Sequence, residues 1–217
     1  MSNQYASFVD VRRRQVILIG LFDAVERSGT RPVEARRMHT LWYLANALAP
    51  AWGLAPFDSA VFKTDSQPYF PAVQADIDAL VGFGMLSVAD LTSSDDGHRM
   101  QGRFAVNRQF CDRVLSSMRS IPEDADLLDF LDDVVQATNR LSDVEQAIAL
   151  TQDATYGDPR IDSGNVIDLG QWTRKGATTP TEYILDRLRA IAGRDLKPAE
   201  LMEMYMDHLG WRLRNGN

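Results

Sequence analysis

Four residues that can carry positive charge lie close together in one short part of the chain: His98, Arg99, Arg103 and Arg108. Guanidinium and imidazolium groups bind phosphate oxygens, and they bind the carboxylates of acidic proteins equally well. Contacts to phosphate hold a protein on a nucleic acid without reading its bases. We therefore predict these four residues as contacts to a nucleic-acid backbone or to an acidic partner protein.

Other reactive residue types do not form a recognisable motif. One cysteine, Cys111, and three scattered histidines cannot supply the ligands of a zinc site. The sequence has no Gly-rich phosphate loop and no Gly-x-Ser-x-Gly elbow. The aspartates between residues 124 and 133 lack the Glu-x-x-His companion of a two-metal bundle. We predict no catalytic residue, no metal site and no cofactor, and we interpret Cys111 as a buried structural thiol.

The cations belong to a stretch, Tyr69–Val106, whose pattern predicts a helix and a hairpin. Apolar residues at helical spacing follow a proline and predict a helix over 71–83, which glycines end. Short strands are predicted from residue 85 and over 100–106, with a polar turn at 92–97 between them. A helix followed by such a hairpin is the second half of a winged helix, in which the hairpin is the wing.

Two helices are predicted before this stretch, over 11–27 and 33–49, and residues 57–67 are predicted as a loop or a short turn of helix. This order completes a winged-helix-like domain over 1–107. The predicted fold class is therefore mainly α with a small β-hairpin, a winged-helix-like N-terminal unit followed by a helical extension over 108–217.

The extension begins with a helix over 108–119, in which Phe110, Val114 and Met118 are predicted to face inward. Further helices are predicted over 122–140, from 143 and from 180, and the last two begin with capping boxes, Ser142 with Glu145 and Thr179 with Glu182. The apolar positions predicted for the helix from 143 are Val144, Ala147, Ile148 and Thr151.

An irregular segment over 153–176 lies between these two helices, and we expect Tyr156 and Trp172 to anchor it. A short strand or an anchor is predicted at Val166, Ile167 and Leu169.

The last predicted helix begins near Pro198 and ends before Gly210. Its apolar stripe fits core packing, and a partner interface is the alternative. Methionine adapts to irregular surfaces, so we name Met202, Met206 and Trp211 as candidate docking residues.

Charge argues against ordinary DNA reading. The net charge is -7 and the pI is near 5.0, whereas binding to phosphates needs clustered cations. Residues 72–83, the helix that would read bases, contain no Arg or Lys, and Asp76 and Asp78 would face the phosphates. DNA contact through the hairpin arginines stays an alternative that we do not favour.

The single cysteine and the start of the chain predict a location for the protein. One cysteine fits a reducing compartment. The first ten residues do not resemble a signal peptide, and the longest apolar run, 16–22, is too short to span a membrane. We expect a cytoplasmic protein with no membrane contact.

Three stretches carry a resemblance to a known family: RRMHTLWYLANALAP (36–50), YFPAVQADIDALVGFGMLSV (69–88) and DATYGDPRIDSGNVIDLG (153–170). They resemble the middle components of bacterial ABC three-component anti-phage defence systems, of which Lamassu-type systems are an example. The resemblance implies a non-enzymatic accessory subunit that bridges an SMC-like or ABC ATPase and an effector. It implies no catalytic residue.

Three functional hypotheses follow. The first is an interaction or adaptor subunit of a bacterial, ATPase-associated complex that works through protein contacts. The alternative is a winged-helix DNA-binding regulator that uses the hairpin arginines. An enzyme without a recognisable motif is the third, and we do not favour it.

Overall fold

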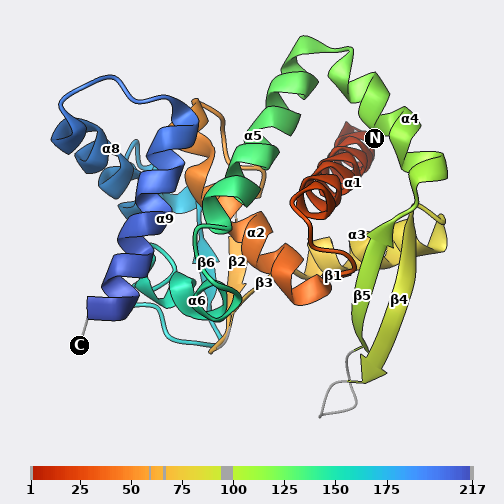
Figure 1. The fold of residues 1–217 in the computed structure, drawn as a ribbon, viewed down its shortest axis with the longest axis horizontal. Coiled ribbons are helices and arrows are strands. Elements are labelled where there is room, and N and C mark those ends of the chain that lie inside the picture. The colour runs from red at the N-terminus through yellow and green to blue at the C-terminus, as the bar shows by residue number, and fades with distance from the viewer. Residues whose placement is uncertain (1, 59, 66, 94–99, 216–217) are drawn as a thin grey trace. The chain divides into compact units, whose positions relative to one another are not determined.

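The structure of the chain, a computed structural model, describes residues 2–58, 60–65, 67–93 and 100–215. Helices make up 62% of it and strands 12%, so the mainly α class with small antiparallel sheets is confirmed (Figure 1). Internal contacts divide the chain into two compact units. Unit 1 comprises Met1–Met38 and Pro71–Asp132, and unit 2 comprises His39–Phe70 and Asp133–Asn217. Each unit is thus discontinuous, whereas the sequence prediction placed one boundary at residue 107.

Five helices contribute to unit 1. They are α1 (Ser2–Arg27), α3 (Pro71–Gly82), α4 (Arg108–Arg119), the first turn of α2 (Ala35–Leu48) and most of α5 (Pro122–Thr138). The predicted helix over 71–83 is confirmed as α3. A proline begins it at a position where no backbone N–H is needed. The chain then turns through a left-handed glycine shortly after the last helical residue (φ +71° at residue 84).

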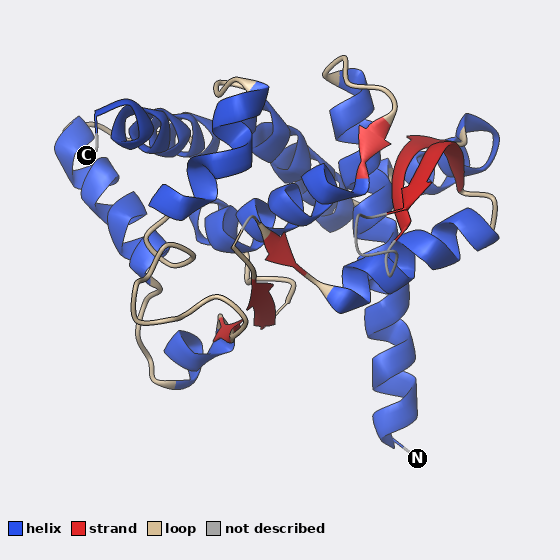
Figure 2. Cartoon of the chain, turned by 90° about the horizontal axis from the view of Figure 1, so that it is seen from below, coloured by secondary structure: helices blue, strands red, loops and turns tan. Residues whose placement is uncertain are grey.

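Three antiparallel strands form the sheet of unit 1 in the order β1-β5-β4. They are β1 (Val33–Glu34), β4 (Leu86–Ser93) and β5 (Met100–Val106). The predicted hairpin is therefore present (Figure 2). Its pairing register shifts between residues 88 and 90. The prediction of helix at residues 33 and 34 was wrong, because fully buried Val33 pairs with Phe104 across the sheet.

The core of unit 1 forms where α1 meets the sheet and α5. The rings of Phe22 and Phe104 meet edge to face at 6.5 Å. Gly20 lets α5 approach closely, because a Cβ there would lie 2.7 Å from the Leu128 side chain. On α4 the buried residues are Cys111, Leu115 and Met118. The predicted inward position of Phe110 was wrong, since the buried stripe begins one residue later and leaves that ring 48% exposed.

The sheet of unit 2 has the order β3-β2-β6. Its strands are β2 (Ala60–Lys63), β3 (Pro68–Tyr69) and β6 (Val166–Asp168). Antiparallel pairing joins Val61 to Ile167, which confirms the strand predicted near residue 167. The prediction of loop or helix over 57–67 was wrong for residues 60–63. They form β2 because they pair with β3 on one side and, on the other, with β6, which comes about a hundred residues later in the sequence.

Helices form the rest of unit 2, together with the later part of α2 and the end of α5. They are η1 (Ala49–Trp52), α6 (Asp143–Ala149), η2 (Leu150–Gln152), α7 (Gly170–Arg174), α8 (Pro180–Ala192) and α9 (Pro198–Asn215). Both predicted capping boxes are present and begin α6 and α8. Two expectations were wrong. Gly210 does not end α9, and Val144 and Ile148 of α6 are 75% and 48% exposed.

Candidate functional site

The outer face of α3 in unit 1 is built from small side chains. Val73, Asp76, Ile77 and Leu80 turn inward, so the opposite face is solvent-exposed. That face carries Pro71, Ala72, Ala75, Asp78 and Gly82. No cation lies on it, and its one carboxylate accepts a hydrogen bond from Gln74 at 3.0 Å. The helix that would read DNA in a winged helix therefore presents a smooth surface with one negative charge.

One aspartate of α3 does not face solvent, contrary to expectation. Asp76 is only 4% exposed. Its carboxylate accepts hydrogen bonds from the Arg14 guanidinium and from the Gln15 amide, the latter at 3.1 Å. Arg14 and Gln15 lie on α1, so this cluster joins two helices. Asp76 therefore stabilises unit 1 and does not act at its surface.

Of the four predicted cations, the structure describes Arg103 and Arg108, and it holds both in ion pairs. Arg103 donates two hydrogen bonds to Asp90 across the hairpin, the one from Nε at 2.9 Å. Arg108 donates to Asp23 and, at 2.9 Å, to Glu26. Both pairs neutralise charge that was predicted to contact a partner.

The Arg108 cluster lies where α4 begins next to α1. Burial lowers the pKa of Arg108, but its bonds to Asp23 and Glu26 outweigh this and raise the pKa overall. Glu26 also accepts a hydrogen bond from the backbone N–H of Val106 at 2.5 Å. The other two predicted cations, His98 and Arg99, lie outside the described residues.

Two exposed phenylalanines lie at the turn that follows α3. Phe83 follows the last residue of α3 and is 59% exposed. The guanidinium carbon of Arg12 lies 5.5 Å from the centre of its ring. Phe110 of α4 lies against the next residue of the turn, since its ring is 4.0 Å from where a Cβ on Gly84 would be. We call Phe83, Gly84 and Phe110 the aromatic surface.

Cys111 is buried beside this surface, as predicted. Its thiol donates to the backbone carbonyl of Met85 at 3.2 Å. Burial raises the pKa of the thiol to about 11, so it is protonated at neutral pH. A protonated, buried thiol is a poor nucleophile.

A polar cluster at the centre of unit 2 surrounds one buried carboxylate. Asp153 is 1% exposed and accepts five hydrogen bonds. The hydroxyls of Tyr43 at 2.5 Å, of Thr181 at 2.7 Å and of Tyr205 donate to it. The backbone N–H groups of Thr155 and Tyr156 supply the other two. These donors come from α2, α8, α9 and the start of the 153–176 segment.

Every group that contacts Asp153 in this cluster is a neutral donor. Burial is the main cause that raises the pKa values of Tyr43 and Tyr205 well above the ordinary value, and the charge of Asp153 adds to it. Both phenols therefore keep their protons and donate. Thr181 is also tied to Thr155 by a hydroxyl contact of 2.7 Å. The arrangement supplies hydrogen-bond donors and no nucleophile or proton acceptor facing solvent.

The 153–176 segment is held by more than this cluster. Tyr156 is 3% exposed, and its hydroxyl donates to the carbonyl of Thr64 at 3.0 Å, so the predicted anchor is present. The Lys63 ammonium donates to the carbonyls of Asp158 and Ile161. Trp172, the second predicted anchor, is only half-buried.

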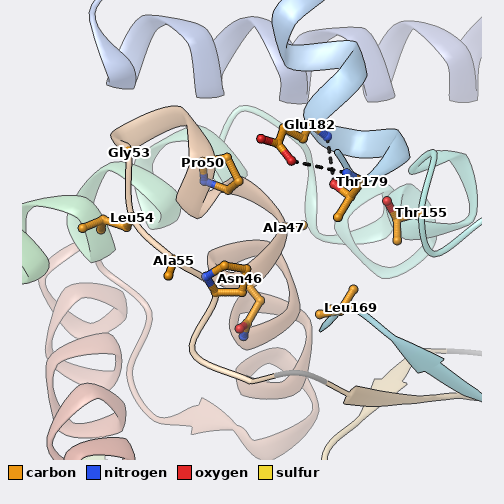
Figure 3. Close-up of a pocket in the computed structure, with 11 residues that line it drawn as sticks. Asn46, Ala47, Pro50, Gly53, Leu54, Ala55, Thr155, Leu169, Thr179 and Glu182 are labelled. Atoms are coloured by element: carbon orange, nitrogen blue, oxygen red, sulfur yellow. Dashed lines mark hydrogen bonds between the residues drawn. The ribbon is translucent and has the colours of Figure 1, made fainter. Parts of the chain in front are cut away.

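A cavity of about 330 Å³ lies in unit 2 beside the start of α8 (Figure 3). Its walls are largely apolar, with Pro50, Leu54 and Leu169 among them. Thr179 and Glu182 line it too, but they hydrogen-bond to each other in the capping box of α8. Its polar groups are thus engaged in holding the fold.

The three predicted docking residues differ in exposure. Met202 and Met206 of α9 are fully buried, so their side chains belong to the core in this structure. Trp211 is 59% exposed. A docking role for this helix therefore depends on Trp211.

Other features of known sites are not found in the part of the chain that the structure describes. No group of three or more His, Cys, Asp or Glu side chains there is placed to hold a metal ion. No helix among those residues has the length and apolar character needed to cross a membrane. Comparison with protein-family models gives no match for this chain, and comparison with curated protein sequences gives none either.

Proposed function

We propose that this protein is a non-enzymatic interaction subunit that works through protein contacts made by unit 1. The observation that carries the proposal is the outer face of α3, where Ala72, Ala75 and Gly82 leave a smooth surface that ends at a turn with two exposed phenylalanines. Aromatic residues are enriched at protein interfaces, whereas charged residues are depleted at the interface core.

The element order of unit 1 supports a winged-helix-like reading of this surface. Helix α1, strand β1, the first turn of helix α2, helix α3 and the hairpin β4–β5 follow one another in the order of that fold, and the rest of α2 belongs to unit 2. In DNA-binding winged helices the residues at the position of α3 bring cations or amides to the bases. Here that face carries Asp78 and no cation, which favours a protein as the partner.

The pairing of Arg103 in the hairpin and of Arg108 at the start of α4 points the same way. Arg103 and Arg108 are held by Asp90, Asp23 and Glu26, so a phosphate would have to compete with carboxylates already in contact. The sequence resemblance to middle components of ABC three-component systems suggests the class of partner: a large ATPase with an associated effector. We propose such a complex as the setting in which the subunit acts.

Two measurements on the full chain test this function. First, a fluorescent 30-base-pair duplex is titrated with the protein at physiological salt, and we expect no binding. Second, the protein is co-expressed with the products of its neighbouring genes, and we expect it to co-purify with an ATPase as a defined complex. Binding of the duplex that is lost in the Arg99→Ala, Arg103→Ala double variant, without a complex, would instead establish the DNA-binding regulator.

A further inference from the structure

We propose that the aromatic surface is the docking site for a helical segment of a partner protein that carries both apolar and acidic side chains. This inference rests on the proposed function, because it names the place and the chemistry of the contact that an interaction subunit makes. Three observations in unit 1 carry it: exposed rings, a smooth adjacent helix face, and arginines beside the rings.

The exposed rings supply the apolar part of the site. Phe83 and Phe110 are 59% and 48% exposed. Phe83 precedes Gly84 in the chain, and the Phe110 ring lies 4.0 Å from where a Cβ on Gly84 would be. A lone exposed apolar residue needs no explanation, but clustered aromatic residues mark binding surfaces. Large aromatic residues also carry much of the free energy at interface hot spots.

The shape of the adjacent helix favours a helical partner. Ala75 and Gly82 lie on the outer face of α3, two helical turns apart, and neither has a long side chain. Small residues allow the axes of two helices to approach within about 8–10 Å. A helix lying along α3 would then place apolar residues, three or four positions apart, against Phe83 and Phe110.

Charge identifies the chemistry of that partner. Arg12 lies over the Phe83 ring, and Arg113 is one helical turn after Phe110 on α4. Within the described residues, Arg113 is in no ion pair, and the nearby Asp112 lies 3.7 Å from Arg108. One ring thus contacts an arginine and the other has an arginine three residues later on its own helix, so carboxylates of a partner would be attracted to this end of α3.

The negative charge of Asp78 on α3 determines where the acidic side chains of the partner can lie. Asp78 is exposed on the outer face, just over one helical turn before Phe83. A carboxylate of the partner next to it would be repelled. The acidic residues of the partner segment are therefore expected near Phe83 and Phe110 and away from Asp78.

The test is a selection from a displayed library of random 16-residue peptides against the full, folded chain. We expect enriched peptides to combine aspartate or glutamate with apolar residues at helical spacing. Three variants are then titrated with the best peptide: Phe83→Ala with Phe110→Ala, Arg113→Glu, and Tyr183→Ala. Tyr183 is the matched control, because it is an aromatic residue of similar exposure (57%) in unit 2.

The double phenylalanine variant should weaken binding by at least about thirtyfold, as expected for aromatic hot spots. Arg113→Glu should weaken it by roughly tenfold at low salt and less at high salt, because exposed charges are screened. Tyr183→Ala should bind as the unchanged protein does. Circular dichroism confirms that each variant is folded.

Other outcomes overturn the assignment in distinguishable ways. Enrichment of basic peptides, or no enrichment, contradicts the proposed chemistry. Peptides that still bind the double phenylalanine variant place the site elsewhere. Concentration-dependent self-association lost in that variant would make a second copy the occupant. In each case co-purification with the ATPase tests the interaction function separately, so that function can stand while this site fails.

Discussion

The carboxylate at the centre of unit 2 is stabilised differently from the buried carboxylates of unit 1. In unit 1, Asp23, Glu26 and Asp76 each contact an arginine. In unit 2, the carboxylate of Asp153 contacts hydroxyls and backbone N–H groups only. Arginine pairs neutralise charge, and several neutral donors can stabilise an anion without a cation. In unit 1, arginines thus stabilise the fold itself, whereas a nucleic-acid-binding protein would direct them outward.

Two natural probes let the units be followed separately. All four tryptophans, at positions 42, 52, 172 and 211, belong to unit 2. The single cysteine, Cys111, is buried in unit 1. Tryptophan fluorescence therefore reports the unfolding of unit 2, and the rate at which the thiol is labelled reports the opening of unit 1.

The largest effect is expected for Asp153→Ala. The substitution leaves three hydroxyls and two N–H groups without their acceptor, and breaking a buried charged cluster costs about 3–5 kcal/mol. Urea unfolding followed by tryptophan fluorescence should show that loss. Asp162→Ala is the control, because Asp162 is an exposed aspartate in the same segment. A loss below about 1 kcal/mol would mean that the cluster does not hold unit 2 together.

An intermediate effect is expected for Arg108→Met, which leaves Asp23 and Glu26 buried without that cation. Because Arg108 is 38% exposed, we expect a loss of about 1–2 kcal/mol. Labelling of Cys111 at pH 8 should be roughly tenfold faster, since 1.4 kcal/mol is a factor of ten. Removing the arginine raises the thiol pKa further, so acceleration cannot come from a more reactive sulfur. Unchanged labelling would show that the pair does not hold unit 1 closed.

The smallest effect concerns pH. Arg160 hydrogen-bonds to Asp158 and lowers its pKa from 3.8 to about 2. The folded state therefore binds this proton less readily than the unfolded state. The contribution to stability is present above about pH 4 and is lost as the pH falls through 2. Because Arg160 is exposed, it amounts to about 1 kcal/mol or less.

The measurement for Asp158 is unfolding by urea at pH 5 and at pH 2.5, compared with Asp158→Asn. The difference in stability between these two pH values should be smaller in the variant. An equal difference in both proteins would show that this ion pair makes no contribution to acid sensitivity.

Local patterns in the sequence predicted much of the fold. The helix over 71–83, the hairpin and both capping boxes depend on neighbouring residues, and all are present. Pairing between distant segments was not predictable in the same way. Strand β2 depends on β6, and β1 is only two residues long, so neither leaves a periodic pattern in the sequence.

The same distinction applies to the candidate site. The exposure of Phe110 was missed because the helical period leaves a choice between two adjacent stripes on α4, and packing selects the one that begins at Cys111. The cluster around Asp153 brings together Tyr43, Thr181 and Tyr205, which are distant in sequence. One signal was visible in the sequence: a long irregular segment that begins with an aspartate and has a tyrosine at its fourth position.

The discontinuity of the two units has a consequence for synthesis on the ribosome. Helices α2 and α5 both cross a boundary between units, and unit 1 needs residues as late as Asp132. Unit 2 needs Tyr205 of the last helix before its carboxylate has all five donors. At about 5–20 residues per second, the first residues of unit 1 therefore wait several seconds for their partners. The nascent chain must keep the apolar surfaces of unit 1 from aggregating until Asp132 has emerged, and those of unit 2 until Tyr205 has emerged.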